Sequence, residues 1–247
     1  MNTQLAIKNE KIYVLEVNPR ASRTVPFVAK SRGIPIAKIA AKIMIGEDLK
    51  ETLNKYKIKE LTNFNVKESV FPFNKFDGVD LILGPEMKST GEVMGIDDTF
   101  LSSYIKSQIA CGNILPSNGN VFISIDDDNK KSIISIAKKL KKMKFNLVAT
   151  KGTAKFLNDN NVNTEQINKV KEGSPHIVDS LTKNEIDLVI NTTKSQSSIK
   201  DSYSIRRTSL MYNIPYYTTI AGAKIAVDAI QHMEKNDFKI KSLQSIN

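Results

Sequence analysis

Glu16 and Asn18 are the first residues of the chain whose types and spacing could support chemistry. They lie two positions apart on the strand that begins with the β-rich run KIYVLE, so both side chains point to the same face. A carboxylate and an amide oxygen on one face suit a hard cation such as Mg²⁺ or Mn²⁺. Gln4 lies on the preceding run QLAIK, which would pair with this strand through a KNEK turn and bring Gln4 to the same site. A hairpin edge that only carries polar side chains is the alternative.

Arg20 and Arg23 follow this hairpin directly, three residues apart. Guanidinium groups bind planar oxyanions and can neutralise the charge on a phosphoryl group during transfer. The two arginines are therefore candidates to hold a polyphosphate or an acyl phosphate beside the cation.

A second polar group occurs where strands of the C-terminal half should end. Gly152 lets a ligand approach the backbone, and the start of a helix there favours a phosphate, as do the hydroxyls of Thr150 and Thr153. Lys169 follows the next short strand. The strand DLVI ends on three further polar residues, Asn191, Thr192 and Thr193. Strand ends of a parallel sheet share one crevice, so we expect a phosphate-monoester site, although Thr150 alone could be a helix cap and Asn191 a turn residue.

The elements that would position these residues form two regions. A hairpin, two helical stretches of which the second ends at Gly46, an irregular or extended segment over 62–73 and a helix over 96–110 make up the first. After a Gly-, Pro- and Asn-rich break at 111–120, strands alternate with helices, beginning with VFISI and an amphipathic helix over 130–143. This predicts an α/β protein whose second domain is a Rossmann-like open parallel sheet, with domains at 1–114 and 115–247.

Composition excludes several classes of function. The net charge of +10 comes from scattered lysines without interleaved aromatic residues, which favours solvated helix faces over a nucleic-acid partner. No apolar run is long enough for a membrane helix and no signal core is present, so we expect no membrane association and a cytoplasmic location. The single cysteine, Cys111, is interpreted as a partly buried hydrophobic residue, and His176 as a structural residue that caps the following helix.

Long stretches of the sequence resemble one family. EVNPRASRTVPFVAKSRGIPIAKIAAKIMIG and VFPFNKFDGVDLILGPEMKSTGEVMGID are similar to the carbamoyl-phosphate synthetase large subunit, in which the first stretch forms the metal-binding end of an ATP-grasp domain. ATKGTA, INKVKEGSPHI, DLVINTT and DSYSIRRTSLMYNIPYYTT resemble its methylglyoxal-synthase-like regulatory domain. The resemblance extends from Met1 to about residue 235, and it implies that the PEMKST loop is an ordered active-site or interdomain loop.

This resemblance implies an activity and its cofactors. Family members make carbamoyl phosphate from ATP, bicarbonate and glutamine-derived ammonia, for pyrimidine and arginine biosynthesis, together with a glutaminase small subunit. The matching residues would be Gln4, Glu16 and Asn18 as ligands of Mg²⁺ or Mn²⁺, and Arg20 and Arg23 as catalytic residues that steady phosphate or carbamate oxygens. ATP would be a substrate.

The resemblance also implies allosteric effectors. The regulatory domain of the family binds nucleoside monophosphates, uridylate (UMP) or inosinate (IMP). The matching contacts here are Lys130, Thr150, Thr153, Lys169, Asn191, Thr192, Thr193 and Ser202. Some members bind ornithine between the domains, and Glu68, Tyr216 and Thr218 match those positions. Neither the sign of regulation nor the oligomeric state follows from the sequence, and an oligomer is possible.

The sequence departs from the family pattern at its start. The resemblance places the nucleotide-holding lobe before Met1, so we expect the isolated chain to have no synthetase activity and to need that upstream part, for example from a split gene. A free nucleotide sensor that folds from about residue 115 is an alternative. Methylglyoxal synthase is another, but that enzyme carries an aspartate just after the strand that reads DLVI here, where this chain has Asn191, Thr192 and Thr193.

Overall fold

The chain begins with the predicted hairpin, seen in a computed structural model that describes residues 1–56, 60, 62–75, 80–83, 88–193, 196–236 and 240–246. Strand β1 (Asn2–Lys8) pairs antiparallel with β2 (Lys11–Asn18). The turn residues Asn9 and Glu10 both have positive φ, 50° and 62°, as a tight two-residue hairpin turn requires. The register places Gln4 directly opposite Glu16.

Three short helices follow the hairpin: α1 (Val25–Arg32), α2 (Ile36–Met44) and α3 (Leu49–Asn54). Helix α1 ends at Gly33, whose left-handed φ of 63° suits glycine. Helix α2 confirms the second predicted helical stretch. The side chain of Asp48 caps α3 by accepting a hydrogen bond from the backbone N–H of Glu51.

The chain divides into two compact units, residues 1–65 with 239–247, and residues 66–238. The hairpin, α1 to α3 and a short C-terminal helix, α11 (Leu243–Ile246), belong to the first unit. The boundary between these units differs from the domain boundary predicted between residues 114 and 115. The domain boundary stays a prediction, because the units reflect only how densely the residues pack.

The second unit starts with a strand pair and a helix. Strand β3 (Phe64–Val70) pairs with β4 (Gly91–Asp97), and the boundary between the units falls within β3. A 3₁₀ turn, η1 (Phe73–Lys75), lies between the two strands in the sequence, and helix α4 (Phe100–Ala110) follows β4. The prediction of a helix from residue 96 was wrong by four residues, because Thr99 caps the helix and accepts the N–H of Ser102. A Cβ atom at Gly95 would lie 1.9 Å from the carbonyl oxygen of Ser103, so β4 and α4 pack backbone to backbone there. The predicted loop PEMKST lies partly outside the described residues, at 85–87.

The predicted parallel sheet is confirmed, with five strands in the order β7-β6-β5-β8-β9. The strands are β5 (Asn120–Ser124), β6 (Asn146–Thr150), β7 (Glu165–Ile167), β8 (Leu188–Asn191) and β9 (Tyr216–Tyr217). The chain winds outward in one direction from β5 through β6 to β7 and then crosses back to β8. The strand order therefore reverses between β5 and β8, which is where ligands bind in open α/β sheets.

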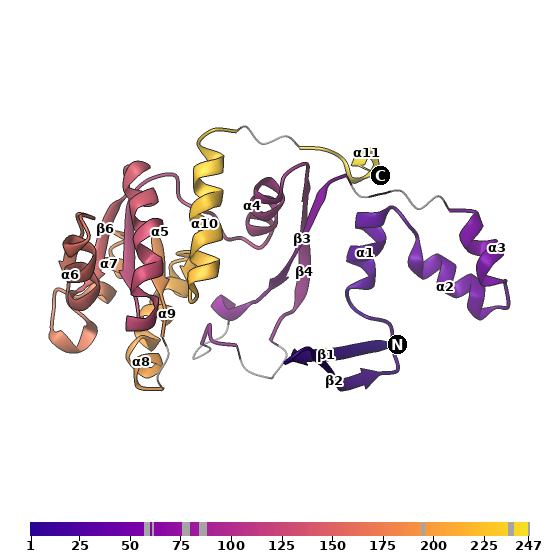
Figure 1. Cartoon of the computed structure of the whole chain (residues 1–247), viewed down its shortest axis with the longest axis horizontal. Coiled ribbons are helices and arrows are strands. Elements are labelled where there is room, and N and C mark those ends of the chain that lie inside the picture. The colour runs from indigo at the N-terminus through magenta and orange to yellow at the C-terminus, as the bar shows by residue number, and fades with distance from the viewer. Residues whose placement is uncertain are drawn as a thin grey trace. The chain divides into compact units, whose positions relative to one another are not determined.

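Helices cover both faces of the sheet. They are α5 (Lys130–Lys142), α6 (Lys151–Asp159), α7 (Ile177–Thr182), α8 (Gln196–Asp201), α9 (Tyr203–Met211) and α10 (Ile220–Met233), with 3₁₀ turns η2 (Asp127–Asn129) and η3 (Val170–Glu172). Val121 and Ile123 of β5 pack in one core with α5, α6 and α10, whereas Phe122 packs in another with α7 and α9. Alternate strand residues thus fill opposite cores. Figure 1 shows α10 running beside α5, with which it is in contact.

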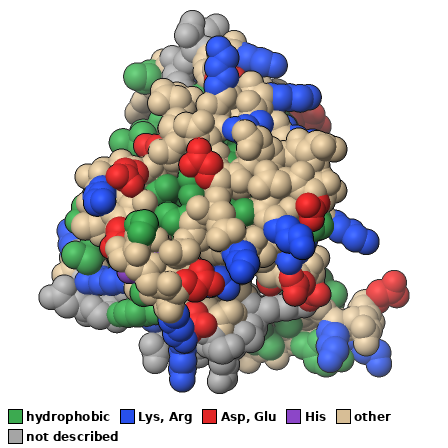
Figure 2. All heavy atoms as spheres, turned by 90° about the vertical axis from the view of Figure 1, so that its left-hand side faces the viewer, with side chains coloured by type: hydrophobic (Ala, Val, Ile, Leu, Met, Phe, Trp, Pro, Cys, Tyr) green, Lys and Arg blue, Asp and Glu red, His purple; other side chains and the backbone are tan. Residues whose placement is uncertain are grey.

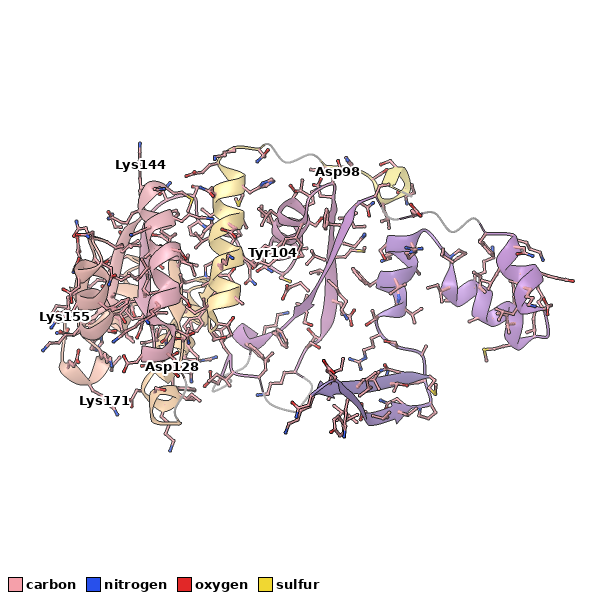
Figure 3. All side chains as sticks on the ribbon, in the orientation of Figure 1. Asp98, Tyr104, Asp128, Lys144, Lys155 and Lys171 are labelled. Carbon is pink, nitrogen blue, oxygen red and sulfur yellow. The ribbon has the colours of Figure 1, made fainter. Side chains whose placement is uncertain are left out.

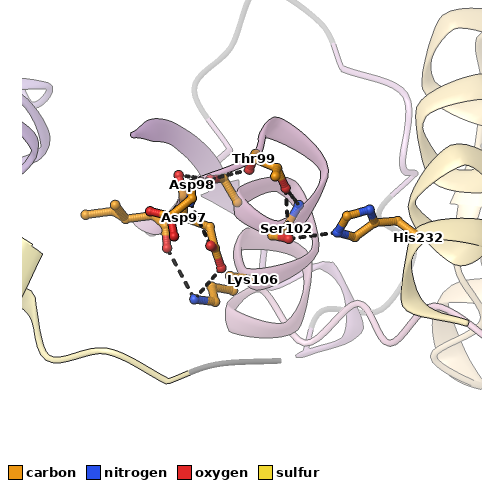
Figure 4. Close-up of polar contacts among 8 residues, drawn as sticks. Asp97, Asp98, Thr99, Ser102, Lys106 and His232 are labelled. Atoms are coloured by element: carbon orange, nitrogen blue, oxygen red, sulfur yellow. Dashed lines mark hydrogen bonds and ion pairs between the residues drawn. The ribbon is translucent and has the colours of Figure 1, made fainter. Parts of the chain in front are cut away.

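Helix α4 is joined to α10 and to β9 by side-chain contacts within this unit. The Oγ atom of Ser102 lies 2.9 Å from Nε2 of His232, and the phenol oxygens of Tyr104 and Tyr217 are 3.3 Å apart (Figure 4 for the Ser102 contact). On the other side of α4, Lys106 forms an ion pair of 2.7 Å with Asp97 at the end of β4. Residues 100–110 are thereby held against the α/β sheet.

Charged side chains are spread over the molecular surface. On the face that Figure 2 shows, lysine and arginine side chains are dispersed and acidic side chains lie among them. None of the described helices is long and apolar enough to span a bilayer.

Candidate functional sites

Polar side chains gather at the carboxyl ends of β5, β6 and β8, as the sequence predicted. Thr150 ends β6, and its hydroxyl donates to Ser124 Oγ at the end of β5, 3.3 Å away. Thr153, in the first turn of α6, accepts the backbone N–H of Ile125 at 3.2 Å. Thr150 and Thr153 are both buried, so their positions are fixed by packing. We call the space at these three strand ends, with Lys130, Gly152 and Thr192 around it, the strand-end crevice.

Thr192 closes the crevice on the β8 side. Its hydroxyl donates to Asp126 Oδ2 at 2.6 Å and accepts the backbone N–H of Asp126 at 3.1 Å. Asp126 also accepts two hydrogen bonds from Asn129, from the backbone N–H at 3.3 Å and from Nδ2 at 2.7 Å. The carboxylate is therefore surrounded by donors and fixes the orientation of the Thr192 hydroxyl.

Lys130 supplies a positive charge to the crevice. Its ammonium lies 4.0 Å from the position that a Cβ atom on Gly152 would occupy, so it sits over the first turn of α6. Asp127 pairs with this ammonium at 2.5 Å. Within 4 Å, a Cβ atom on Gly152 would meet only this ammonium, so the missing side chain leaves the first turn of α6 uncrowded beside the cation.

Asn191 lies beside this crevice but faces a different partner. It is opposite Ser124 in the β5–β8 register and is buried. Its Nδ2 donates to the phenol oxygen of Tyr216 on β9 at 2.6 Å. Burial raises the pKa of Tyr216 far above its ordinary value, so the phenol is neutral.

The remaining predicted effector residues are less closely grouped. Lys169 is exposed and lies at the N-terminal end of η3, two residues after β7. Its neighbour Lys171 lies at the same end of the unit as Asp128, whereas Lys144 lies at the opposite end (Figure 3). Thr193 is half-buried after β8. Ser202 is buried and its hydroxyl is occupied within the fold: it donates to the carbonyl of Ser198 and accepts from Arg206, both at 2.7 Å.

A cavity of about 260 Å³ lies elsewhere in the same unit. Tyr216 and Thr218 line it, together with apolar and aromatic side chains that include Phe71, Leu81, Leu83 and Tyr217. Glu68, the third residue predicted for an ornithine-type effector, is not among its lining residues.

Glu68 is half-buried and accepts a hydrogen bond from Gln108 Nε2 at 3.1 Å. Burial raises the pKa of Glu68, and the bond from Gln108 offsets only part of this rise. Burial, with a smaller effect from the Glu68 charge, raises the pKa of Cys111 on the cavity wall to about 11, so the thiol is protonated and behaves as the small hydrophobic residue that the sequence indicated.

The three predicted metal ligands converge on one atom. Gln4 Nε2 lies 2.5 Å and Asn18 Nδ2 lies 2.9 Å from Glu16 Oε1. All three side chains offer oxygen atoms, so the donor set fits a hard divalent cation once both amides rotate to present their oxygens. They contain one carboxylate, and among the described residues no group of three or more His, Cys, Asp or Glu could hold a metal ion.

Arg20 and Arg23 are exposed beyond the end of β2. Arg20 donates to the carbonyl of the adjacent Ala21 at 3.1 Å. His176 caps α7 by accepting the N–H of Asp179, so its predicted structural role is confirmed.

Two residues of the crevice were missed by the sequence analysis. Ser124 is the last residue of the buried strand β5 and Asp126 follows it, in the stretch ISIDDD. A serine and a carboxylate at the end of an apolar strand are the signal that could have identified them.

Two protein-family models match separate parts of the chain. Residues 1–52 match the model of the carbamoyl-phosphate synthase L chain, ATP binding domain, and residues 132–218 match that of the MGS-like domain. The carbamoyl phosphate synthase large chain of Myxococcus xanthus (strain DK1622) is 51% identical over 244 residues, which are 99% of this chain and 22% of that protein. The chain belongs to this large-chain family.

Its place within the family is the C-terminal region. The carbamoyl phosphate synthase large chain, C-terminal section, of Aquifex aeolicus (strain VF5) is 46% identical and is matched by the whole of this chain over 50% of its own length. The chain thus spans about a fifth of the full-length large chains and half of that C-terminal section. Methylglyoxal synthase from Elizabethkingia anophelis NUHP1 is similar over 46% of this chain and 79% of its own, at 19% identity and a TM-score of 0.36.

Proposed function

We propose that this chain provides the C-terminal part of a carbamoyl phosphate synthase large chain, and that its strand-end crevice binds a nucleoside monophosphate as an allosteric effector. The observation that carries the proposal is the ammonium of Lys130 over the Gly152 turn at the start of α6. This places a cation, a helix N-terminus and fixed threonine hydroxyls around one small volume. Such an arrangement favours a phosphate group.

Within this crevice, the phosphate would lie between Lys130 and the first turn of α6. Thr150 and Thr153 border that space, and Lys169 is positioned after the adjacent strand to approach from outside. Asn191, Thr192 and Thr193, with Ser202 further along the chain, would contact the ribose and base of UMP or IMP. The cavity lined by Tyr216 and Thr218, with Glu68 nearby, is the proposed site of an ornithine-type effector.

We further infer that the hairpin contributes to the site where carbamate is phosphorylated. Gln4, Glu16 and Asn18 would hold Mg²⁺ or Mn²⁺, which when bound neutralises phosphate charge and orients ATP oxygens. Arg20 and Arg23 would steady the oxygens of the transferred phosphoryl group or of carbamate. ATP would be the substrate of this reaction. We place the reaction in the cytoplasm, where its product would serve pyrimidine and arginine biosynthesis.

The 247 residues on their own are proposed to lack synthetase activity. Both faces of the hairpin are apolar and open, with Ile7 74%, Val14 63% and Leu15 64% exposed. A lone two-stranded hairpin is only marginally stable in water, so these side chains need a covering partner. The proposed partners are the upstream part of the large chain, which would cover this hairpin, and a glutaminase small subunit.

Calorimetric titration of the chain with UMP and with IMP tests the effector site. Lys130→Met should weaken binding by roughly tenfold or more, because it removes a charge-assisted contact to phosphate. Lys138→Met on the exposed face of α5 is the matched control and should leave the affinity unchanged. Absence of heat and of a change in melting temperature with either nucleotide, or equal effects of the two variants, would overturn the proposal.

A free nucleotide sensor without catalysis is the second candidate. The observation in its favour is that the crevice lies wholly within the compact unit of residues 66–238. Carbamoyl phosphate formation after addition of an upstream large-chain segment and a small subunit would exclude the sensor reading. Effector binding with no activity in that mixture would support it.

A further inference from the structure

Arg206 is the most deeply buried charged side chain among the described residues, with 1% of its surface exposed. It lies on α9 and donates to both oxygens of Asp80, from Nε at 2.6 Å and from Nη2 at 2.5 Å. A bidentate pair of this kind fixes both planar groups. The backbone N–H of Ile82 also donates to Asp80 Oδ1, at 3.3 Å, so Asp80 organises the segment that follows it.

The guanidinium has two further partners on its other edge. Nη1 donates to Ser202 Oγ at 2.7 Å, and the guanidinium lies close enough to the Tyr216 phenol for its charge to oppose the rise that burial causes in the pKa of that phenol. Tyr216 receives a hydrogen bond from Asn191 as well. Four side chains therefore lie in series: Asn191 is bonded to Tyr216, the Tyr216 phenol lies within reach of the Arg206 charge, and Arg206 is bonded to Asp80. We call this series the arginine bridge.

The two ends of the arginine bridge lie at different candidate sites. Asn191 ends β8, next to Ser124 and Thr192 at the strand-end crevice. At the other end, Leu81 and Leu83 directly follow Asp80 and line the 260 Å³ cavity, to which Tyr216 also contributes. Every member of the bridge belongs to the compact unit of residues 66–238.

We propose that Arg206 is a positioning residue that couples the strand-end crevice to the cavity, by holding Tyr216 and the Asp80–Leu83 wall in one arrangement. A ligand that draws Asn191 toward the crevice would remove the hydrogen bond to Tyr216 and shift its phenol relative to the Arg206 charge, and through Arg206 and Asp80 it would alter the wall of the cavity. The ligand arm of this inference rests on the proposed nucleotide site, whereas the bridge itself does not.

The side chain at position 206 has to be arginine for this role. Its planar fork serves three acceptors in different directions at the same time, and it stays charged when buried. A lysine has the charge but no fork, so it could retain one acceptor and would release the others. Arg206→Lys therefore separates coupling from the presence of a positive charge.

Hydrogen exchange at the amides of Leu81, Ile82 and Leu83 provides the readout, because the Ile82 N–H is bonded to Asp80. Without any ligand, Asn191→Ala should change exchange at these amides by about threefold or more relative to the unaltered chain, since local openings report local hydrogen bonds. The same change in an Arg206→Lys background should have no such effect. Arg207→Lys, at the adjacent arginine, should preserve the response and is the matched control.

Tyr216→Phe is the second variant, in case Arg206→Lys does not fold. It removes the phenol oxygen to which Asn191 donates while the Arg206–Asp80 pair remains, and it should abolish the response to Asn191→Ala. The inference is overturned if Asn191→Ala, as the only substitution, leaves hydrogen exchange at 81–83 unchanged, or if it changes that exchange equally in every background. Arg206 would then only stabilise the fold.

Addition of UMP to the unaltered chain is the ligand arm. It should change exchange at 81–83 in the same region, and Arg206→Lys should remove that change while UMP still protects residues 150–153. A response to Asn191→Ala without any response to UMP would leave the bridge standing and count against the nucleotide site. Protection of 150–153 by UMP with no change at 81–83 would overturn the coupling.

Discussion

The hydroxyl of Thr192 and the carboxylate of Asp126 are joined at 2.6 Å across the ends of two adjacent parallel strands. The hydroxyl donates its one proton to Oδ2 of this carboxylate, and its oxygen accepts the backbone N–H of Asp126. Thr192 therefore cannot donate to an anionic ligand without releasing Asp126. The carboxylate also adds negative charge beside a crevice whose other features favour phosphate. Its repulsion therefore lowers the affinity for a nucleotide phosphate that Lys130 and the start of α6 raise.

Replacing Asp126 by Asn should tighten binding of UMP or IMP by roughly three- to tenfold, because it removes a like charge near the phosphate and loosens the hold on the Thr192 hydroxyl. Calorimetric titration at moderate salt measures this. Asp128→Asn changes the net charge equally at an exposed position of η2 and should have an effect below about twofold, since exposed charges are screened. Weaker binding by Asp126→Asn would mean that the carboxylate instead orients Thr192 for the ligand.

The sheet and most crevice residues could be predicted from the sequence for one physical reason. Apolar β-rich runs alternate with amphipathic helices, and this alternation places every strand end, with Thr150 and Asn191, at one edge. Asp126 was missed because its role depends on a neighbour 66 positions away, Thr192. The same applies to Arg206 and Asp80, which lie 126 positions apart: of two adjacent arginines on a helix at most one can face a given site, and the sequence shows neither which one nor what it contacts.

Local signals also compete at element ends. The extended run before Thr99 has helix-forming neighbours, and only Asp98 and the capping Thr99 separate β4 from α4. Compactness is harder still to predict. Residues 66–110 pack with the α/β sheet although the sequence break occurs at 111–120, because α4 contacts α10, and such contacts between distant segments leave no local pattern.

Removing the Ser102 hydroxyl should weaken the attachment of α4 to α10. Ser102→Ala loses the contact with His232 Nε2 and the hydrogen bond that Thr99 Oγ1 donates to Ser102 Oγ. We expect the free energy of unfolding in urea to fall by about 0.5–2 kcal/mol, the usual net value of two hydrogen bonds less the better helix propensity of alanine. Ser135→Ala, on the exposed face of α5, is the control and should leave the free energy of unfolding unchanged or slightly higher. In a His232→Gln background, Ser102→Ala should cost less; an unchanged cost would show that the two residues do not interact.

Asp80 should make stability depend on pH in the acid range. Burial alone would raise its pKa, but hydrogen bonds from Arg206 and the backbone N–H of Ile82, with the charge of Arg206, outweigh burial and leave the pKa below its ordinary value. A carboxyl whose pKa is depressed by folding contributes stability above the pKa it has when unfolded, and this contribution is lost as pH falls through the lower, folded value. Asp80→Asn should therefore destabilise the chain at pH 6–8, and the difference from the unaltered chain should shrink below about pH 4. Urea unfolding across this range measures it, and a difference that is constant with pH would contradict the assignment.

Glu16 should decide whether the hairpin binds a divalent cation. It is the one carboxylate of the three converging side chains, and both amides already point to its Oε1. Glu16→Gln keeps the shape and the paired register but removes the negative charge, so the affinity for Mn²⁺ should fall by about tenfold or more, measured by electron paramagnetic resonance of free Mn²⁺.

Glu10→Gln, at the turn of the same hairpin, makes the same charge change away from these residues and is the matched control. It should leave Mn²⁺ binding as it is. Equal loss in both variants would show that Mn²⁺ responds to overall charge rather than to a site. If the unaltered chain binds Mn²⁺ only once an upstream large-chain segment is added, and Glu16→Gln abolishes that binding, then the hairpin supplies part of a site that the other segment completes.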